Sequence, residues 1–151
     1  MTTRLTSSLL PKFLSNVDTF LFDCDGVLWK GGVGINGVGA VISSLQALGK
    51  RCYFVTNNST KSRSTYVEML DRVSGIKTAK DFMLTSAYAA GVYLRESGIT
   101  KKVYVVGDSG LCAELREVAG VECLGFEDAG KSFSFGKVTK DELDKEVEAV
   151  V

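Results

Sequence analysis

Short apolar runs alternate along this chain with stretches whose apolar residues recur at helical spacing. Three runs have the length and composition of buried strands, and they cover residues 17–23, 51–56 and 82–85. The stretches that follow them predict helices, which run from Val38 to Leu48, from 62 to 73 and from 87 to 94. Strands separated by helices form right-handed βαβ units around a parallel sheet. We therefore expect an α/β fold whose first sheet is parallel.

A second strand and helix pattern follows in the last third of the chain. It predicts a strand at 103–106, a helix at 111–118 and a strand at 121–124. Thr139 and Glu142 have the spacing of a capping box, which predicts a helix that runs on through Leu143 and Val147. Residues 149–151 are apolar and strand-favouring with no turn or polar tail, as expected for a chain cut inside a strand.

Two carboxylates follow the first predicted strand, in the order Asp23-Cys24-Asp25-Gly26. Alternate residues of a strand point to the same face, so Asp23 and Asp25 can converge on one point above the strand's end. One carboxylate can then act as a nucleophile while the other transfers protons, and the two can share a cation. The alternative is a surface turn, because Asp and Gly are common turn residues.

Hydroxyl and amide side chains follow the second predicted strand, as Thr56-Asn57-Asn58. At a strand's end before a helix, such residues offer hydroxyl, amide and backbone N–H donors to an anion. Ligands of open α/β sheets bind beyond the carboxyl ends of the strands, so the acids and these donors should meet there. The alternative for these residues is a helix cap.

The composition of the chain excludes several other classes of protein. The 18 basic and 18 acidic side chains leave no net charge, which argues against a nucleic-acid-binding protein. No apolar stretch approaches the roughly 20 residues of a membrane span. The sequence contains no histidine, so neither a Ser-His-Asp triad nor a zinc site with imidazole ligands can be built from it. Carboxylate chemistry is what remains.

The cysteines favour a reducing compartment. The four of them form no CxxC pair, and Cys24 and Cys52 lie in predicted buried strands, where a thiol acts as a small hydrophobe. A reduced, cytoplasmic setting fits this pattern best. The first sixteen residues lack acids and are rich in Ser and Thr, a weak resemblance to an organellar presequence. We expect a loose N-terminal extension instead.

Three segments together resemble a known family of enzymes. They read DTFLFDCDGVLW from Asp18, LGKRCYFVTNNSTKSR from Leu48 and LTSAYAAGVYL from Leu84. Their motifs and spacing are similar to those of the haloacid dehalogenase superfamily, in the branch of phosphoglycolate, para-nitrophenyl phosphate and pyridoxal phosphate phosphatases. The resemblance implies a partial Rossmann-like parallel-sheet core at 1–86, a connecting helix at 87–99 and the incomplete beginning of an α/β cap domain at 100–151.

The resemblance also implies a chemistry. Asp23 would attack the phosphorus of a small phosphomonoester to form an aspartyl-phosphate, and Asp25 would act as general acid and base. Thr56, Asn57 and Asn58 would bind the phosphoryl oxygens. Mg²⁺ would be held by the Asp23 carboxylate, the Asp25 backbone carbonyl and an acid beyond residue 151. The family's phosphate-binding Lys has no convincing copy in this sequence.

Two alternatives to this assignment stay open. Gly107-Asp108 after an apolar run resembles the family's acidic metal-binding motif, and with Lys101 or Lys102 it would make a complete, capless phosphatase. Against this, the motif's second acid would fall on Cys112, which is unsuitable for magnesium, so Asp108 is left out of the site. The other alternative is a non-catalytic fragment that binds phosphate-bearing ligands or assembles with another chain.

The missing half of such a core would also expose an edge of the sheet. The first strand would then present unpaired backbone groups beside Asp23, which favours pairing or aggregation. We expect that a second copy of the chain covers this edge, giving a homo-oligomer, or that the chain is poorly soluble.

Two nearby side chains each allow two interpretations. Trp29, with the glycines from Gly31 to Gly39, would either form a mobile segment that gates the site or simply pack. Arg63 would either assist anion binding or lie on a solvated face of its helix, and we expect the solvated face.

Overall fold

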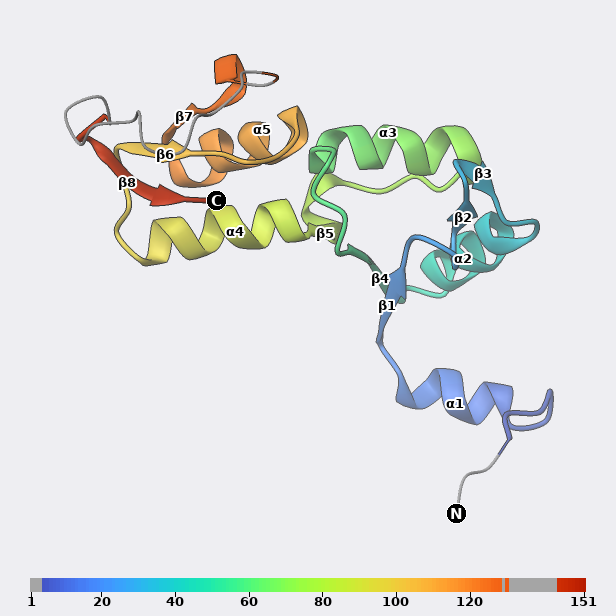
Figure 1. Cartoon of the computed structure of the whole chain (residues 1–151). Coiled ribbons are helices and arrows are strands. Elements are labelled where there is room, and N and C mark those ends of the chain that lie inside the picture. The colour runs from blue at the N-terminus through green and yellow to red at the C-terminus, as the bar shows by residue number, and fades with distance from the viewer. Residues whose placement is uncertain (1–3, 129, 131–143) are drawn as a thin grey trace. The chain divides into compact units, whose positions relative to one another are not determined.

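A computed structural model describes residues 4–128, 130 and 144–151 (Figure 1). The chain divides into two compact units. The first comprises Met1–Thr56 and Val67–Leu84, and the second comprises Asn57–Tyr66 and Thr85–Val151. Each unit is built around a three-stranded sheet.

The sheet of the first unit has the strand order β1-β4-β5. Its strands are β1 (Thr19–Asp23), β4 (Arg51–Thr56) and β5 (Met83–Thr85). β1 and β4 run parallel, with Thr19 opposite Arg51 and Asp23 opposite Val55. The predicted α/β class and its parallel sheet are confirmed, and the second predicted strand agrees with β4 at both ends.

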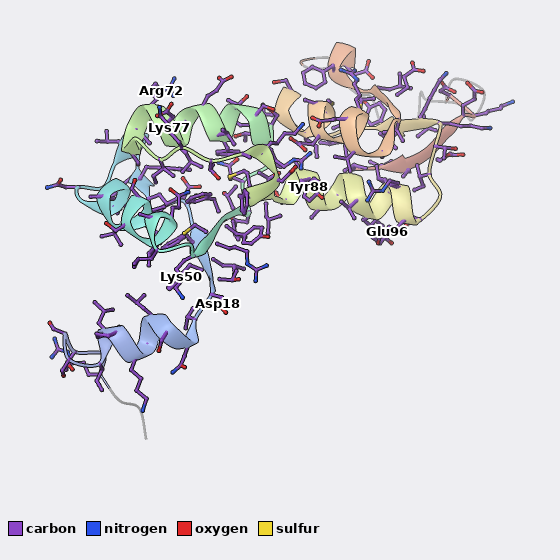
Figure 2. All side chains as sticks on the ribbon, turned by 180° about the vertical axis from the view of Figure 1, so that it is seen from behind. Asp18, Lys50, Arg72, Lys77, Tyr88 and Glu96 are labelled. Carbon is purple, nitrogen blue, oxygen red and sulfur yellow. The ribbon has the colours of Figure 1, made fainter. Side chains whose placement is uncertain are left out.

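An ion pair lies at the amino ends of β1 and β4. Lys50 Nζ is 3.3 Å from Asp18 Oδ1, and both residues are labelled in Figure 2. The backbone N–H of Arg51 donates to the carbonyl oxygen of Asp18 at 2.9 Å, which extends the β1–β4 ladder by one residue. Because the Asp18 carboxylate is exposed, the ion pair adds little to stability.

A short hairpin follows β1. Its strands are β2 (Trp29–Lys30) and β3 (Val33–Gly34), which pair antiparallel. Gly31 and Gly32 join them with φ angles of 58° and 79°, as required by the two-residue turn whose central residues are both left-handed. The sequence analysis named only Trp29 and the glycines from Gly31 to Gly39 here, without strands, so the hairpin is a finding of the structure.

Apolar side chains from helices and strands form the core of the first unit. Its helices are α2 (Val38–Ala47), α3 (Arg63–Ser74, of which the first residues belong to the second unit) and the 3₁₀ turn η1 (Lys80–Phe82). The buried members include Ile42, Phe54, Leu70, Ile76 and Met83. The hairpin packs so closely on the end of α3 that a Cβ atom on Gly34 would overlap the carbonyl oxygen of Val73.

The residues before β1 form a helix, α1 (Leu10–Asn16), where the sequence predicted a loose extension. Pro11 lies in its first turn, where a helix tolerates proline because that N–H has no helical partner. Phe13 packs edge-on against Phe20 of β1, with the ring centroids 6.2 Å apart. No residue of α1 is buried, so the helix lies on the surface of the first unit.

β1 lies at the edge of its sheet. It pairs with β4 on one side, and no other strand of the described residues pairs with it. Leu21 is 66% exposed and Phe20 and Phe22 are half-buried, so the strand is less buried than its apolar sequence predicted. The open hydrophobic edge is therefore present, while its covering by a second copy stays a prediction.

The second unit contains a parallel sheet of its own, in the order β7-β6-β8. The elements are α4 (Ser86–Glu96), β6 (Lys102–Tyr104), α5 (Ser109–Ala119), β7 (Glu122–Leu124), η2 (Phe126–Asp128) and β8 (Val147–Val150). Both outer strands run parallel to β6. α4 and α5 pack closely at Gly91, where a Cβ atom would come within 2.9 Å of Val118 Cβ. Leu94, Val103 and Leu115 are buried in this core.

The end of the chain corrects one prediction and agrees with another. Val147 lies in β8 and not in a helix, because the segment that contains it pairs with β6. The capping box at Thr139 and Glu142 lies outside the described residues. The strand expected at the end is present, with Ala149 opposite Val103 and Val150 opposite Tyr104.

No helix among the described residues has the length and apolar character needed to cross a membrane.

Candidate active site

The first predicted acid and the first predicted phosphate ligand lie at the carboxyl ends of neighbouring strands. Asp23 ends β1, and Thr56 ends β4 one residue beyond the partner of Asp23. Parallel pairing brings these two ends to the same edge of the sheet, as the sequence predicted. Thr56 is buried, and its hydroxyl lies 3.5 Å from Asp25 Oδ2, at the limit of a hydrogen bond.

Asp25 is held by the tight turn that follows β1. Gly26 adopts a φ of 84°, and its N–H donates to the carbonyl oxygen of Trp29 at 2.7 Å. The N–H of Leu28 donates to the carbonyl oxygen of Cys24 at 2.8 Å. A side chain at position 26 would strain the turn, because L residues rarely adopt this φ. The closed turn thus fixes the backbone that carries Asp25.

The indole of Trp29 donates to Asp25 Oδ1 at 2.8 Å. Trp29 is only 2% exposed, so this donor is presented by a ring that is packed in place. Together with Thr56 at Oδ2, each oxygen of the Asp25 carboxylate has a neighbouring donor. The sequence allowed packing or gating for Trp29 and missed this contact; the available signal was a buried N–H donor four residues after the acid, across a Gly turn.

The Asp23 carboxylate differs from that of Asp25 in its hydrogen bonding, although both residues are exposed. No N–H or O–H of the described residues donates to Asp23, and no described cation forms an ion pair with it. Its oxygens are therefore accessible to a substrate or a cation. An accessible carboxylate at the end of a strand can act as a nucleophile once a phosphoryl group is placed beside it.

Cys24 lies between the two acids and faces the interior. Burial, followed by the negative charges of Asp23 and Asp25, raises the pKa of its thiol to about 12. The thiol therefore stays protonated near neutral pH and does not compete with Asp23 as a nucleophile. The four cysteines of the chain are all free and buried.

Asn57 and Asn58 follow Thr56 directly but belong to the second unit. Asn58 Oδ1 accepts hydrogen bonds from the backbone N–H and the hydroxyl of Thr60, at 3.0 and 2.8 Å. The carbonyl oxygen of Asn57 accepts from Ser86 Oγ at 2.8 Å. These bonds shape the loop before α3, in which the Asn58 side chain closes an Asx turn. Asn58 does not cap the helix, because the side chain that accepts at the start of α3 is that of Ser62, from the N–H of Thr65 at 3.3 Å.

Arg63 is not solvated, so the expected exposed face was wrong. It is buried, with Nε 2.8 Å from Glu114 Oε2, and its backbone N–H donates to Glu114 Oε1 at 2.6 Å. Its guanidinium carbon lies 3.9 Å from the centroid of the Tyr88 ring. The partner is 51 residues away in the sequence, which is why local helical spacing could not predict it.

Asp108 lies in the second unit, immediately before α5. The position four residues on, Cys112, is buried in that unit's core and cannot serve as an open ligand position. This burial gives no support to the capless arrangement in which Asp108 holds a metal.

The metal-binding capacity of the described residues is limited. No group of three or more acidic, cysteine or histidine side chains gathers within 4–128, 130 and 144–151. The oxygens of Asp23 and Asp25 are nevertheless the hard donors that Mg²⁺ prefers, and the protonated thiol of Cys24 offers no competing soft ligand. The donor chemistry therefore fits magnesium, which is commonly held by one or two carboxylates with waters and a substrate phosphate.

The chain belongs to the family of haloacid dehalogenase-like hydrolases, whose family model matches residues 20–121. Within that family its relatives are phosphatases. Phosphoglycolate phosphatase 2 of Arabidopsis thaliana is 41% identical over 150 residues, which cover 97% of this chain and 50% of that protein.

Solved structures agree with this placement. The p-nitrophenyl phosphatase from Archaeoglobus fulgidus superposes with a TM-score of 0.65 and 33% identity, over 74% of this chain and 42% of that chain. A glycerol phosphate phosphatase from Mycobacterium tuberculosis, solved in complex with magnesium, gives a TM-score of 0.64 and 25% identity, over 74% of this chain and 33% of that chain. The chain thus spans half or less of the length of these relatives.

Proposed function

We propose that this chain supplies the nucleophile and the acid–base group of a phosphomonoester hydrolase. The observation that carries the proposal is the contrast between two acids at one strand end: Asp23 is open, and Asp25 has donors at both carboxylate oxygens. A nucleophile must be accessible, whereas an acid–base group must be oriented. The names of the relatives support a phosphatase, and we propose small phosphorylated metabolites as its substrate class.

The reaction follows from these two roles. A carboxylate oxygen of Asp23 attacks phosphorus, the bond to the leaving oxygen breaks, and Asp25 gives that oxygen its proton. Asp25 then takes a proton from a water molecule, which attacks the phosphorus of the aspartyl-phosphate. Inorganic phosphate leaves and the Asp23 carboxylate is restored, so both acids end in their starting states.

The phosphoryl oxygens would be bound by the polar run after β4. The Thr56 hydroxyl already lies beside Asp25, so it can serve the phosphoryl group and the acid together. Asn57 and Asn58 would contribute N–H donors next to it in the chain. Positioned donors of this kind supply much of the catalysis in phosphoryl transfer, because the transition state spreads negative charge over these oxygens.

Mg²⁺ would be held by the Asp23 carboxylate, the Asp25 backbone carbonyl and an acid beyond residue 151, with waters as the remaining ligands. When bound it supplies positive charge that offsets the charge of the phosphoryl group.

The remaining assignments also stand as proposals. Residues 1–86 are the first part of the catalytic core, 87–99 the connecting helix and 100–151 the start of a cap. The separate β7-β6-β8 sheet supports a cap domain here, because a simple continuation of the core would add strands to the first sheet. Four free, buried thiols support a reducing compartment such as the cytoplasm.

The direct test is hydrolysis of 4-nitrophenyl phosphate by the folded chain, with and without Mg²⁺. The wild type should release nitrophenolate only with the metal, and Asp23→Asn should abolish the release. Asp108→Asn is the matched control, an exposed acid outside the proposed site, and should leave the rate unchanged. Activity that survives Asp23→Asn would overturn the proposal, and activity lost in Asp108→Asn would restore the capless arrangement.

A further inference from the structure

The single tryptophan of the chain lies against the proposed acid–base group and is bonded to it in two ways. Its indole N–H donates to Asp25 Oδ1 at 2.8 Å, and its backbone pairs with Asp25 as a β-bridge. The carbonyl oxygen of Trp29 also accepts from the N–H of Gly26 at 2.7 Å. Side chain and backbone of one residue therefore hold both ends of the turn that carries the acid.

The indole itself has little freedom to move. Trp29 is 2% exposed, and Leu28 beside it is fully buried. Trp29 is opposite Gly34 in the β2–β3 hairpin, and Gly34 packs against the carbonyl oxygen of Val73 at the end of α3. The donor is thus anchored through the hairpin to the packed helix, and not to a solvent-exposed loop.

A carboxylate with a fixed donor at one oxygen has a preferred orientation. The indole bond at Oδ1 is short, at 2.8 Å, whereas the Thr56 hydroxyl lies 3.5 Å from Oδ2, at the limit of a hydrogen bond. Oδ2 is therefore the oxygen able to exchange a proton with a substrate. Without the indole, the carboxyl group could rotate about its last side-chain bond, and either oxygen could point away from the leaving group. Misorientation of a reacting group by about 1 Å can cost on the order of 10²-fold in rate.

We propose that Trp29 is a positioning residue for Asp25, whose indole N–H locks one carboxylate oxygen so that the other faces the leaving group of the substrate. This inference deepens the proposed phosphatase function and rests on it for its catalytic consequence. The hydrogen bond itself does not depend on turnover, so the two can be tested separately.

The first experiment observes the indole directly. Because the chain has one tryptophan, its side-chain N–H gives a single resonance in a ¹H–¹⁵N spectrum. We expect exchange of this proton with water to be at least about 10-fold faster in Asp25→Ala than in the wild type, since a protected hydrogen bond must open before exchange. Asp23→Ala is the matched control, two residues away and without a bond to the ring, and should leave the exchange rate unchanged.

The second experiment separates positioning from packing by the choice of leaving group. An alkyl phosphate needs its leaving oxygen protonated, whereas 4-nitrophenolate leaves without a proton. Trp29→Phe keeps an aromatic ring and removes the donor. It should lower kcat/KM for glycerol phosphate by about 10-fold or more and that for 4-nitrophenyl phosphate by less than about 3-fold, because only the first reaction draws on the general acid.

A packing control accompanies this variant. Phe54→Leu removes bulk from a fully buried ring of β4 in the same unit, so any general loosening should change both substrates by the same factor. Equal losses for both substrates in Trp29→Phe would overturn the positioning role. Equal indole exchange in the wild type and Asp25→Ala would overturn the hydrogen bond on which it depends.

The outcomes also distinguish this inference from the function on which it rests. If the wild type hydrolyses neither ester, the proposal that this chain is a phosphatase is overturned. The exchange experiment then still decides whether the indole holds Asp25. If both esters are hydrolysed but the indole N–H exchanges equally fast in the wild type and in Asp25→Ala, the phosphatase function is supported and the positioning role of Trp29 is overturned.

Discussion

Acidic side chains in the two units of this chain lie in opposite environments, one exposed to water and one buried against a cation. In the first unit, Asp23 and Asp25 are both exposed at the end of β1. In the second unit, Glu114 of α5 is 0% exposed, and both of its oxygens accept hydrogen bonds from Arg63, at 2.6 and 2.8 Å. The same functional group is thus open to ligands in one place and sealed in the other.

The difference follows from the cost of burying charge. A carboxylate taken out of water loses several kcal/mol of hydration, which a close partner of opposite charge offsets only with good geometry. Arg63 provides that geometry from its side chain and backbone, and its guanidinium stacks on the Tyr88 ring. Glu114 therefore has a structural role. Asp23 remains exposed to water, which a substrate or Mg²⁺ can displace. Exposure and unfilled bonding capacity, more than charge, separate the two kinds of acid.

The largest effect expected from this comparison is on activity at the open acid. Asp23→Asn should lower phosphatase activity by at least about 10³-fold, as loss of a nucleophile does. Because the carboxylate is exposed and accepts no bond from the described residues, stability should change by less than about 0.5 kcal/mol. Rates and urea unfolding of the same sample check both parts, and a large loss of stability would show that Asp23 is also structural.

The sealed acid should show the reverse pattern. Glu114→Gln keeps the shape but removes the buried negative charge that lies nearest to Arg63, so we expect a loss of about 3 kcal/mol in the free energy of unfolding. The matched control is Glu117→Gln, since Glu117 lies 3.6 Å from the same guanidinium but is 46% exposed. That change should cost less than about 1 kcal/mol. Equal costs for the two variants would mean that burial is not what makes the Glu114 pair matter.

A smaller effect is expected where α5 meets the segment before Arg63. A Cβ atom on Gly110 would overlap the backbone of Lys61 and the carbonyl oxygen of Thr60. Gly110→Ala should therefore push apart the two segments that carry Glu114 and Arg63, at a cost of about 1–3 kcal/mol in urea unfolding. Ser109→Ala, on the exposed side of the same turn, is the control and should change stability by less than about 0.5 kcal/mol. A neutral Gly110→Ala would contradict the close approach.

The smallest effect concerns a buried thiol of the second unit. Burial first, then the neighbouring Cys112, raises the pKa of Cys123 from 9.0 to about 11. The unfolded chain then loses this proton at lower pH than the folded one. The stability that the Cys123 thiol contributes to the folded state is therefore fully present below pH 9, and it is lost as pH rises through the folded pKa. Unfolding free energy should fall by up to about 1 kcal/mol more between pH 8 and pH 9.5 than in Cys123→Ala. Identical pH slopes for the two proteins would count against the shift.

Regular elements were predictable from the sequence where local pattern and tertiary packing agree. The strand predicted for the run RCYFVT begins and ends at the same residues as β4, because the apolar and β-branched residues of this run suit a central strand. The position of Asp23 and Thr56 at one edge of the sheet also followed from the sequence, since the carboxyl ends of parallel strands lie at the same edge. The placement of these polar side chains could therefore be predicted from residue order and strand pattern.

Contacts that depend on side-chain direction or on distant partners were not predictable. The bond from Trp29 to Asp25 requires the turn closed at Gly26, and no periodicity reports where an indole points in such a turn. The pair of Arg63 and Glu114 joins positions 51 residues apart. The helix predicted through Val147 was wrong there, because strand pairing with β6 overrides a local helical pattern.

The strand registers carry a consequence for synthesis of the chain. Partners in β1 and β4 are 32 positions apart, from Thr19 to Arg51, so that pair can close soon after residue 56 leaves the ribosome. In the other sheet, the partners of Lys102 are Glu122 and Val147, which lie 20 and 45 positions further on. β6 therefore gains one neighbour early and waits for the other until translation passes residue 150. During synthesis, β1, which ends at Asp23, can therefore pair with β4 well before the sheet of the second unit is complete.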